Sequence, residues 1–317
     1  FAYSTDGTAQ TIVGVLLAAL FVLLILDKLH TTLAAGIVTV ALLLISAATP
    51  YQVMDFDTAV RSVDWNVIFL LGSMMSIVAV LIETRLFDWM TARMVVSAKG
   101  QAQPLMRIIC AGTGLLSAFA DNVTTVLFVT PMVNKVAKTL RISVWVIAMP
   151  MIMAANIGGT ATLIGDPPNV VIGVASGQTF MEFIYFLTMP IIIMMIALNY
   201  FATWFYRREL AGAHAPSDED ESAAEAIAFE HPKVLRWTLW MIALTFAGFF
   251  SHSLTHLPVG VVAFAGAVLV MAGRHIILKQ QMSGKQAEHA FTHIFERGIE
   301  WLTLGFFVFL FMVISSA

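Results

Sequence analysis

Apolar runs separated by short polar segments recur along the whole sequence. Seven of them approach the length of about 20 residues that a helix needs to cross a bilayer. These runs lie at roughly 11–29, 31–49, 65–82, 184–206, 234–252, 258–273 and 300–317. The pattern predicts an all-α polytopic membrane protein.

Two further apolar regions are interrupted by polar residues. Residues 107–133 contain Ala120-Asp121-Asn122, and residues 144–176 contain breaks at 156–159 and 165–169. Irregular backbone inside a bilayer survives only where protein encloses it or water reaches it. We expect a re-entrant hairpin at 107–133 and a broken helix at 144–176.

The composition agrees with a membrane protein. The 317-residue chain is 59% hydrophobic and 12% charged, whereas soluble domains carry about 25% charged residues. A soluble enzyme is therefore not expected. The net charge of −3 implies no nucleic-acid partner, and the lone Cys110 excludes an internal disulfide and a cysteine-based zinc site.

The distribution of basic residues predicts the orientation of the chain. If 107–133 enters and leaves on one side and 144–176 crosses, all 17 Lys and Arg residues except Arg61 share one side. A single kinked span at 107–133, or a hairpin at 144–176, separates them less completely. Because cytoplasmic loops carry an excess of Lys and Arg, we expect the N-terminus outside and 207–233 in the cytoplasm. The membrane is expected to be a bacterial inner membrane.

The segment 207–233, with its acidic run at 217–222, has the composition of a linker between two parts. We expect a first repeat at 1–206, which contains the hairpin and the broken helix. The corresponding elements have no counterpart in 234–317. We therefore expect an incomplete second repeat there, in a piece of a longer protein.

A short similarity supports the repeat. Arg61 stands four residues before Trp65, and Arg297 stands four residues before Trp301, with an acidic residue directly before each tryptophan. In the predicted topology the two tryptophan spans enter from opposite sides. Similar sequences in opposite orientation are typical of inverted-repeat transporters.

The tip of the expected hairpin combines an ionisable group with oxygen donors. Asp121 is the only ionisable side chain there, and Asn122, Thr124 and Thr125 follow it. Asp121 could carry a proton or bind a cation, with Asn122 and Asn156 as further ligands for Na⁺. It also suits the N-cap of a half-helix. Capping needs no charge, and burying one costs several kcal/mol, so we favour a functional role.

The broken helix supplies the second set of candidate binding residues, which are Asn156, Gly158, Gly159, Thr160, Thr162, Asp166 and Asn169. The glycines allow close backbone approach and positive φ. Asp166 before Pro167 is typical of an N-cap with proline at the first helical position. That context explains Asp166 by itself, and a role in proton or cation coupling is the alternative.

Both regions would direct the N-terminus of a half-helix at one place. The partly positive N-termini suit an anion, whereas Asp121 and Asp166 suit a cation. A site that binds an anionic substrate together with a coupling cation would use both the helix N-termini and the carboxylates.

Three other features have structural interpretations. Residues 84–98 alternate apolar and charged positions, which predicts an amphipathic helix on the membrane surface. Glu83 ends a span near Arg85, where we expect it at the membrane interface. Asn199 lies in an apolar span, where asparagine is typical of helix–helix contacts.

The two polar loops, Ser117–Thr125 and Asn156–Asn169, resemble the signatures of the ion transporter superfamily. The chain is most similar to its arsenite-permease and P-permease branch, which resembles the divalent-anion/sodium symporters. Leu26–His30 and Val63–Asn66 are also similar to that branch. The symporters carry Ser-Asn-Thr at the sodium site of the hairpin tip. The sequence here is Asp121-Asn122-Val123-Thr124, and the extra acid favours proton coupling or direct cation binding.

The resemblance implies inverted repeats, dimerisation through scaffold helices and elevator-type movement. We therefore expect a secondary active transporter, not an enzyme, that moves an inorganic ion or small oxyanion with H⁺ or Na⁺ and without a cofactor. The expected partners are the substrate, bilayer lipid and a second copy of the chain. The alternatives are a Na⁺/H⁺ antiporter of the same superfamily, an ion channel and a membrane scaffold without transport.

Overall fold

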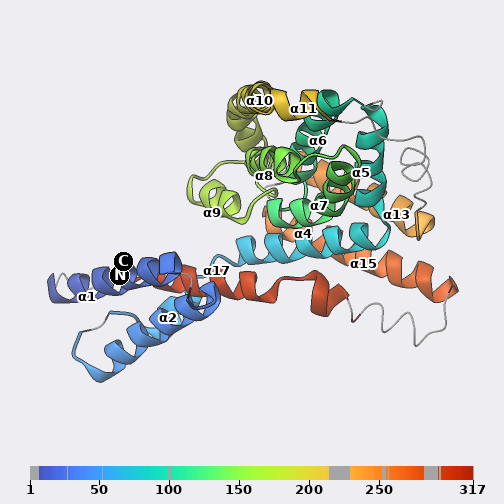
Figure 1. Cartoon of the computed structure of the whole chain (residues 1–317). Helices are drawn as coiled ribbons and strands as arrows, with labels where there is room; N and C mark the ends of the chain where they lie inside the picture. The colour runs from blue at the N-terminus through green and yellow to red at the C-terminus, as the bar shows by residue number, and fades with distance from the viewer. Residues whose placement is uncertain are drawn as a thin grey trace. The chain divides into compact units, whose positions relative to one another are not determined.

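The computed structural model describes residues 7–26, 28–51, 53–98, 101–213, 229–251, 255, 257–281, 292 and 294–316. Within these ranges every regular element is helical. The chain forms two compact units, one of Phe1–Gly72 and Glu300–Ala317 and the other of Ser73–Ile299 (Figure 1). The acidic run at 217–222 lies outside the described residues.

The predicted membrane spans are present as helices. In the described part of the chain, seven helices are long and apolar enough to cross a bilayer, namely Gly7–Leu26, Thr31–Ala48, Trp65–Glu83, Phe180–Phe205, Pro232–Phe250, Val259–Gln280 and Ile294–Ile314. Each overlaps one predicted span, so the prediction is confirmed. The protein is an all-α membrane protein with several spans.

The helices of the first unit are α1 (Gly7–Leu26), α2 (Thr31–Ala48), α3 (Phe56–Arg61), the beginning of α4 (Trp65–Glu83) and α17 (Trp301–Ile314). α2 packs against both α1 and α17. The hydroxyl of Thr32 donates to the carbonyl of Leu302 at 2.7 Å. Gly36 faces the ring of Phe309, where an added Cβ would come within 3.3 Å of the ring.

The second unit contains the end of α4, α5 (Leu86–Ser97), α6 (Ala102–Ser117), α7 (Asn122–Thr139), α8 (Trp145–Gly159), α9 (Pro167–Ala175), α10 (Phe180–Phe205), α11 (Arg207–Ala211), α13 (Pro232–Phe250), α15 (Val259–Gln281) and a π-helical turn, η1 (Ile294–Gly298). α8 contacts α6, α7 and α10, and α13 packs against α15. Ile147, Met151 and Ala154 of α8 are fully buried. α8 therefore forms the centre of the helices that carry the polar loops.

Both interrupted regions are present, but the break predicted at 156–159 is wrong, because these residues form the last turn of α8. The first separates α6 from α7 at residues 118–121, and the second separates α8 from α9 at residues 160–166. α6 and α7 extend beyond the expected hairpin at 107–133, because the helical pattern continues through the polar residues at both of its ends. The interruptions fall where the sequence placed Asp121 and the Gly165-Asp166-Pro167 turn.

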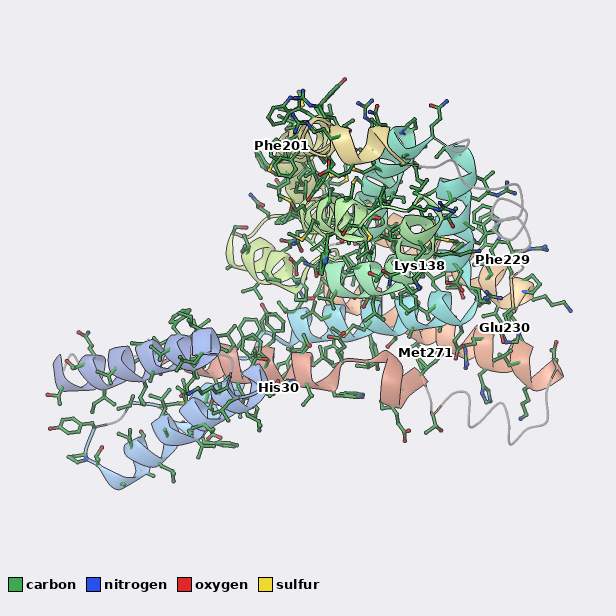
Figure 2. The ribbon with its side chains drawn as sticks, viewed as in Figure 1. His30, Lys138, Phe201, Phe229, Glu230 and Met271 are labelled. Carbon is green, nitrogen blue, oxygen red and sulfur yellow. The ribbon has the colours of Figure 1, made fainter. Side chains whose placement is uncertain are left out.

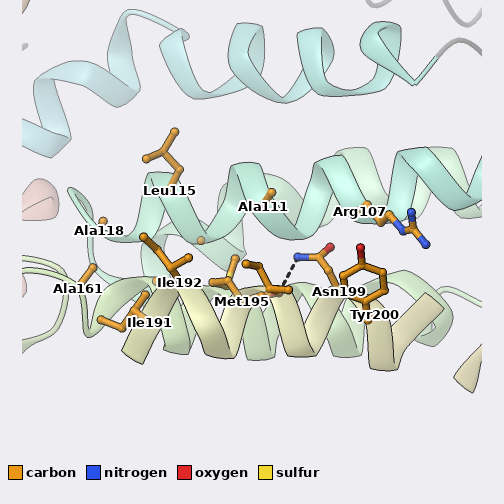
Figure 3. A pocket seen from close by; sticks show the side chains of 13 residues that line it. Arg107, Ala111, Leu115, Ala118, Ala161, Ile191, Ile192, Met195, Asn199 and Tyr200 are labelled. Carbon is orange, nitrogen blue, oxygen red and sulfur yellow. Dashed lines mark hydrogen bonds between the residues drawn. The ribbon is translucent and has the colours of Figure 1, made fainter. Parts of the chain in front are cut away.

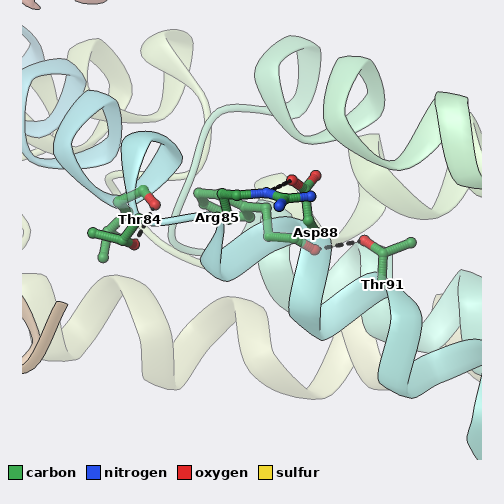
Figure 4. A network of polar contacts seen from close by, with 6 residues as sticks. Thr84, Arg85, Asp88 and Thr91 are labelled. Carbon is green, nitrogen blue, oxygen red and sulfur yellow. Dashed lines mark hydrogen bonds and ion pairs between the residues drawn. The ribbon is translucent and has the colours of Figure 1, made fainter. Parts of the chain in front are cut away.

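α5 corrects the expectation of a helix on the membrane surface. Its residues Phe87, Met94 and Val95 are buried, and the helix packs against α6 and α7. Arg85 precedes it in a left-handed conformation with φ 60°, and its Nε donates to Asp88 Oδ2 at 3.1 Å (Figure 4). The apolar face of the amphipathic pattern is thus covered by protein.

Glu83 is the last residue of α4, and its ion-pair partner lies on another helix. Both of its carboxylate oxygens accept hydrogen bonds from Arg274 on α15. Arg274 is only 2% exposed. The pair therefore joins α4 to α15 inside the second unit.

The outer face of α10 is apolar along its length. Phe186, Met189, Ile193 and Phe201 are all exposed, and Phe201 is labelled on this helix in Figure 2. Such a face is unfavourable in water and suits contact with hydrocarbon. This exposure supports the assignment of α10 as a membrane span.

Candidate ion and substrate site

The first interruption is organised by Asp121. Asp121 is the N-cap of α7, with φ −56° and ψ 154°, and its carboxylate accepts a hydrogen bond from the backbone N–H of Thr124 at 2.8 Å. A carboxylate at this position satisfies a free N–H and interacts favourably with the partly positive helix end. The capping role predicted for Asp121 is confirmed, and its role with ions stays a prediction.

The second interruption is organised by Thr162. Its hydroxyl donates to the carbonyl of Ala118 at 2.6 Å and accepts from the N–H groups of Ile164 and Gly165 at 3.2 and 3.1 Å. Local bonds from threonine hydroxyls stabilise turns in place of helix. Because Ala118 belongs to the first interruption, Thr162 also ties the two interruptions together.

Asn169 closes the second interruption from the other side. It lies in the first turn of α9, and its side-chain amide donates to the carbonyls of Gly159 and Thr162, both at 2.9 Å. Both Asn169 and Thr162 are buried. Their polar groups satisfy backbone groups that the broken helix leaves without partners.

The glycines allow the chain segments to approach closely. A Cβ atom on Gly158 would meet the carbonyl oxygen of Gly114 in α6, and one on Gly165 would meet the carbonyl oxygen of Gly159. Among the described residues the glycine with positive φ is Gly177, outside the interruptions. The prediction of close approach is confirmed, whereas the prediction of positive φ is wrong, because α8 stays helical to Gly159 and the turn is made by Thr162.

Asn122 connects three chain segments at one point. Its Nδ2 donates to Asn156 Oδ1 at 2.8 Å and, with a longer bond of 3.4 Å, to Asp166 Oδ2. Asn122 begins α7, Asn156 lies in the last turn of α8, and Asp166 directly precedes α9. The two half-helices therefore begin together, as expected from the sequence.

The charge distribution at this point is mixed. The partly positive N-termini of α7 and α9 lie beside the partly negative C-terminus of α8. The carboxylates of Asp121 and Asp166 both belong to this junction, because Asp121 directly precedes Asn122 and Asp166 accepts a hydrogen bond from Asn122. Among the described residues we find no group of three or more His, Cys, Asp or Glu side chains that could hold a metal ion. A cation here would therefore need amide or carbonyl oxygens besides the two carboxylates.

The candidate residues fall into two groups. Asn122 bonds to both Asn156 and Asp166, and all three residues are at least partly exposed. The hydroxyls of Thr125 and Thr160 bond to nearby backbone carbonyls, as the polar groups of Thr162 and Asn169 do. Thr124 contributes its N–H to the Asp121 cap. The first group has polar atoms available for a ligand, and the second shapes the backbone around it.

Ser117, the last residue of α6, is a further candidate that was not among the predicted binding residues. Its side chain is fully buried, and its Oγ has no hydrogen-bond partner in the part of the chain that the structure describes. It lies beside Gly159, where an added Cβ would come within 3.1 Å of this oxygen. Buried hydroxyls without partners are rare and indicate a site for water or an ion. Gly114 could not be recognised from the sequence, because it matters through its contact with Gly158 of another helix.

Comparison with known proteins adds independent information. The family model described as citrate transporter, CitMHS, matches residues 21–316. An uncharacterized transporter of Mycobacterium tuberculosis is 29% identical over 94% of this chain and 66% of its own length. A 46 kDa membrane protein of Mycobacterium leprae is 30% identical over 93% of this chain and 65% of its own length. The chain thus spans slightly less than two thirds of these relatives.

A shorter similarity extends to animals. The P protein of Homo sapiens is 34% identical over 52% of this chain and 20% of its own length, and that of Sus scrofa is 36% identical over 51% and 19%. The matched family and the mycobacterial transporter are transport proteins rather than enzymes. These similarities agree with the polar loops in pointing to transport.

Proposed function

The chain belongs to the CitMHS citrate transporter family, and on that premise we propose that the protein is a secondary active transporter of a small anion coupled to H⁺ or Na⁺. The observation that carries the proposal is the contact of Asn122 with both Asn156 and Asp166, where two interrupted helices meet. Interrupted helices with polar tips are typical of transporter binding sites.

The charges around Asn122 indicate how one site serves two ions. The N-termini of α7 and α9 and the amide of Asn122 attract an anion. The carboxylates of Asp121 and Asp166 repel it until a proton or Na⁺ neutralises them. Binding of the cation thereby raises the affinity for the anion, and the anion raises the affinity for the cation by the same factor. This reciprocal effect is the basis of coupled transport.

The substrate in the proposal is a small inorganic ion, an oxyanion or a carboxylate. The family name supports a carboxylate such as citrate, whereas the compact polar site supports a smaller ion such as arsenite or chloride. The proposal also includes inverted repeats at 1–206 and 234–317, elevator-type movement and a homodimer. The N-terminus would lie outside, 207–233 would lie in the cytoplasm, and the bacterial relatives support a plasma-membrane location.

A second candidate function is Na⁺/H⁺ antiport at the same site. The presence of two carboxylates at this junction, those of Asp121 and Asp166, favours it, because two such groups can exchange protons for a cation. Antiport predicts that a sodium gradient drives proton movement without any added anion. Anion symport predicts that no such movement occurs until the anion is present.

The test is counterflow by the complete protein in proteoliposomes, with labelled citrate, arsenite, chloride and Na⁺, each with and without a pH gradient. The Asn122→Ala variant removes both hydrogen bonds of the junction, and we expect it to reduce flux at least about tenfold, corresponding to about 1.4 kcal/mol. Asn134→Ala is the matched control, because Asn134 is exposed on the same helix.

Two results would contradict the proposal. Equal flux by the Asn122→Ala and wild-type proteins would exclude this junction as the binding site. Flux that depends on ion concentration alone, with no response to a pH or sodium gradient, would favour a channel. A well-folded protein without flux for any of the four ions would favour the membrane scaffold.

A further inference from the structure

A cavity of about 460 Å³ lies between α6, α8 and α10, apart from the junction around Asn122. Most of its lining is apolar. Ile192 and Met195 of α10 lie along its length (Figure 3), and Leu115 of α6 and Ile196 of α10 also line it. Leu115, Ile192 and Ile196 are each about half exposed or more, at 62%, 48% and 53%. The cavity therefore opens on the outer, apolar face of α10.

The polar side chains gather at one end of this cavity. Figure 3 shows Arg107, Asn199 and Tyr200 together there, with Ala118 and Ala161 at the other end. The lining is thus amphipathic along the length of the cavity. A ligand that fits it has a polar or charged head and an apolar tail.

Arg107 is held in place by neutral groups. Its Nε donates to the hydroxyl of Thr203 at 3.0 Å, and its guanidinium lies 5.6 Å from the centre of the Tyr200 ring. In the described ranges, no carboxylate forms an ion pair with Arg107. The guanidinium has five N–H donors in all and pairs well with phosphate. The end of the cavity therefore carries a positive charge that no carboxylate of the described residues neutralises.

Asn199 adds an acceptor at the same end. Its Nδ2 donates to the carbonyl of Met195, one turn earlier on α10, at 2.9 Å. Its Oδ1 is buried and has no hydrogen-bond partner within the residues that the structure describes. A buried acceptor without a partner is rare and costs about 1–3 kcal/mol. A donor on a bound ligand would satisfy it.

We propose that this cavity binds an anionic phospholipid, with an acyl chain between α6 and α10 and the phosphate at Arg107. Charge complementarity supports the phosphate, and the exposed apolar walls support the chain. A headgroup with free hydroxyls, as in phosphatidylglycerol, supplies the donor that Asn199 Oδ1 lacks. Displacement of water from the apolar walls gives the chain its favourable free energy.

The position along α10 is consistent with a lipid headgroup. Beyond Tyr200 follow Phe201, Trp204 and Phe205, whose rings contact one another, and Arg207 lies 5.8 Å from the Trp204 ring. Clustered aromatic and basic side chains are typical of the membrane interface, where they contact headgroups. The polar end of the cavity therefore lies at the depth of headgroups and its apolar part at the depth of acyl chains.

The bound chain would end at Ala118 and Ala161, which belong to the two interruptions. This contact gives the lipid a route to affect the junction, but the binding proposal does not depend on transport. A protein without transport activity would still bind the lipid.

The test is native mass spectrometry of the complete purified protein with phosphatidylglycerol or phosphatidylcholine of the same chain length. We expect preferential retention of phosphatidylglycerol by the wild-type protein. Arg107→Gln should lower that retention about tenfold, since charge-assisted hydrogen bonds are the strong ones. Arg93→Gln is the matched control, because Arg93 also lies over an aromatic ring, that of Trp89 at 5.5 Å, and this variant should retain the lipid fully.

A second pair of variants tests the apolar part. Ile192→Trp fills the cavity and should reduce the retention of phosphatidylglycerol by a similar factor. Ile193→Trp is its control, because Ile193 is similarly exposed on the same helix and does not line the cavity. This pair keeps the proposal testable if Arg107→Gln impairs folding.

Several outcomes would overturn the proposal. They include equal retention of the two lipids by the wild-type protein, equal retention by the Ile192→Trp and Ile193→Trp variants, and loss of the bound lipid on addition of inorganic phosphate, which would indicate a small-anion site. A change of oligomeric state in Arg107→Gln with unchanged lipid retention would assign the cavity to an interface between copies of the chain.

Discussion

Arg274 and Glu83, which are 191 residues apart in sequence, form a two-point ion pair, with Nε to Oε2 at 2.7 Å and Nη2 to Oε1 at 2.8 Å. Arg274 is almost completely buried, whereas the Glu83 side chain is 28% exposed. The guanidinium fork matches the two carboxylate oxygens, which is the geometry that gives such pairs their specificity. The pair fixes α15 against α4.

This pair leads to a prediction about stability. Glu83→Ala removes both acceptors while the Arg274 guanidinium stays buried, so we expect the free energy of unfolding to fall by about 2–5 kcal/mol. Asp88→Ala, which breaks the exposed Arg85–Asp88 pair, should cost less than about 1 kcal/mol. Unfolding of both variants in the same detergent measures the difference. Equal losses would show that the burial of Arg274 has no energetic consequence.

The contact between α6 and α8 is sensitive to a single methyl group. Gly158→Ala would place Cβ against the carbonyl of Gly114, and we expect a loss of about 1–3 kcal/mol or more as the helices separate. Gly14→Ala in α1 is the control, because no atom lies within 4 Å of its added Cβ. Helix propensity should make that variant up to about 1 kcal/mol more stable. Thermal unfolding compares them, and a neutral Gly158→Ala would contradict the close packing.

Capping by Asp121 can be separated from its charge. Serine caps helices about as well as aspartate, so Asp121→Ser should keep stability within about 1 kcal/mol while removing the carboxylate. If Asp121 couples a cation, flux driven by a proton or sodium gradient should fall at least about tenfold. Asp55→Ser is the control, because Asp55 caps α3 through the N–H of Thr58 at 3.3 Å. Unchanged coupled flux in Asp121→Ser would show that Asp121 caps α7 but does not couple a cation to transport.

Thr162 offers a test of how the interruptions are held. Thr162→Val keeps the shape of the side chain but removes the bond to the Ala118 carbonyl and the acceptor for two N–H groups. We expect a loss of about 1–3 kcal/mol in unfolding free energy. In Thr188→Val the lost bond is to Ile184 within an exposed stretch of α10, and the loss should be below about 0.5 kcal/mol. Similar losses would exclude a special role for Thr162.

The spans and interruptions could be predicted because each depends on local sequence. About 20 apolar residues in a bilayer form a helix, since no other conformation satisfies the backbone of a single segment. Asp121 and Pro167 are specific signals for a helix start, and α7 and α9 begin there. The resemblance to the ion transporter superfamily, which came from the same two loops, is confirmed by the family match.

Contacts between distant residues could not be predicted in this way. Local sequence placed Glu83 at a span end near Arg85 and carried no sign of its partner Arg274, which is on another helix. Sequence spacing also gave all the polar residues of the two loops the same role. In the structure Asn122 joins three segments, whereas Thr162 and Asn169 bond to the backbone. These differences depend on helix packing, for which one sequence carries no direct signal. The cavity at Arg107 is of the same kind.

The approach of Gly158 to Gly114 has a geometric consequence. Backbone meets backbone there, so no side chain can change rotamer to absorb a shift of α8 along α6. Any sliding of one helix would be transmitted undiminished to Ala118 and Thr162, whose bond of 2.6 Å lies just beyond both helix ends. We therefore expect the hairpin of α6 and α7 and the broken helix of α8 and α9 to move together as one rigid unit.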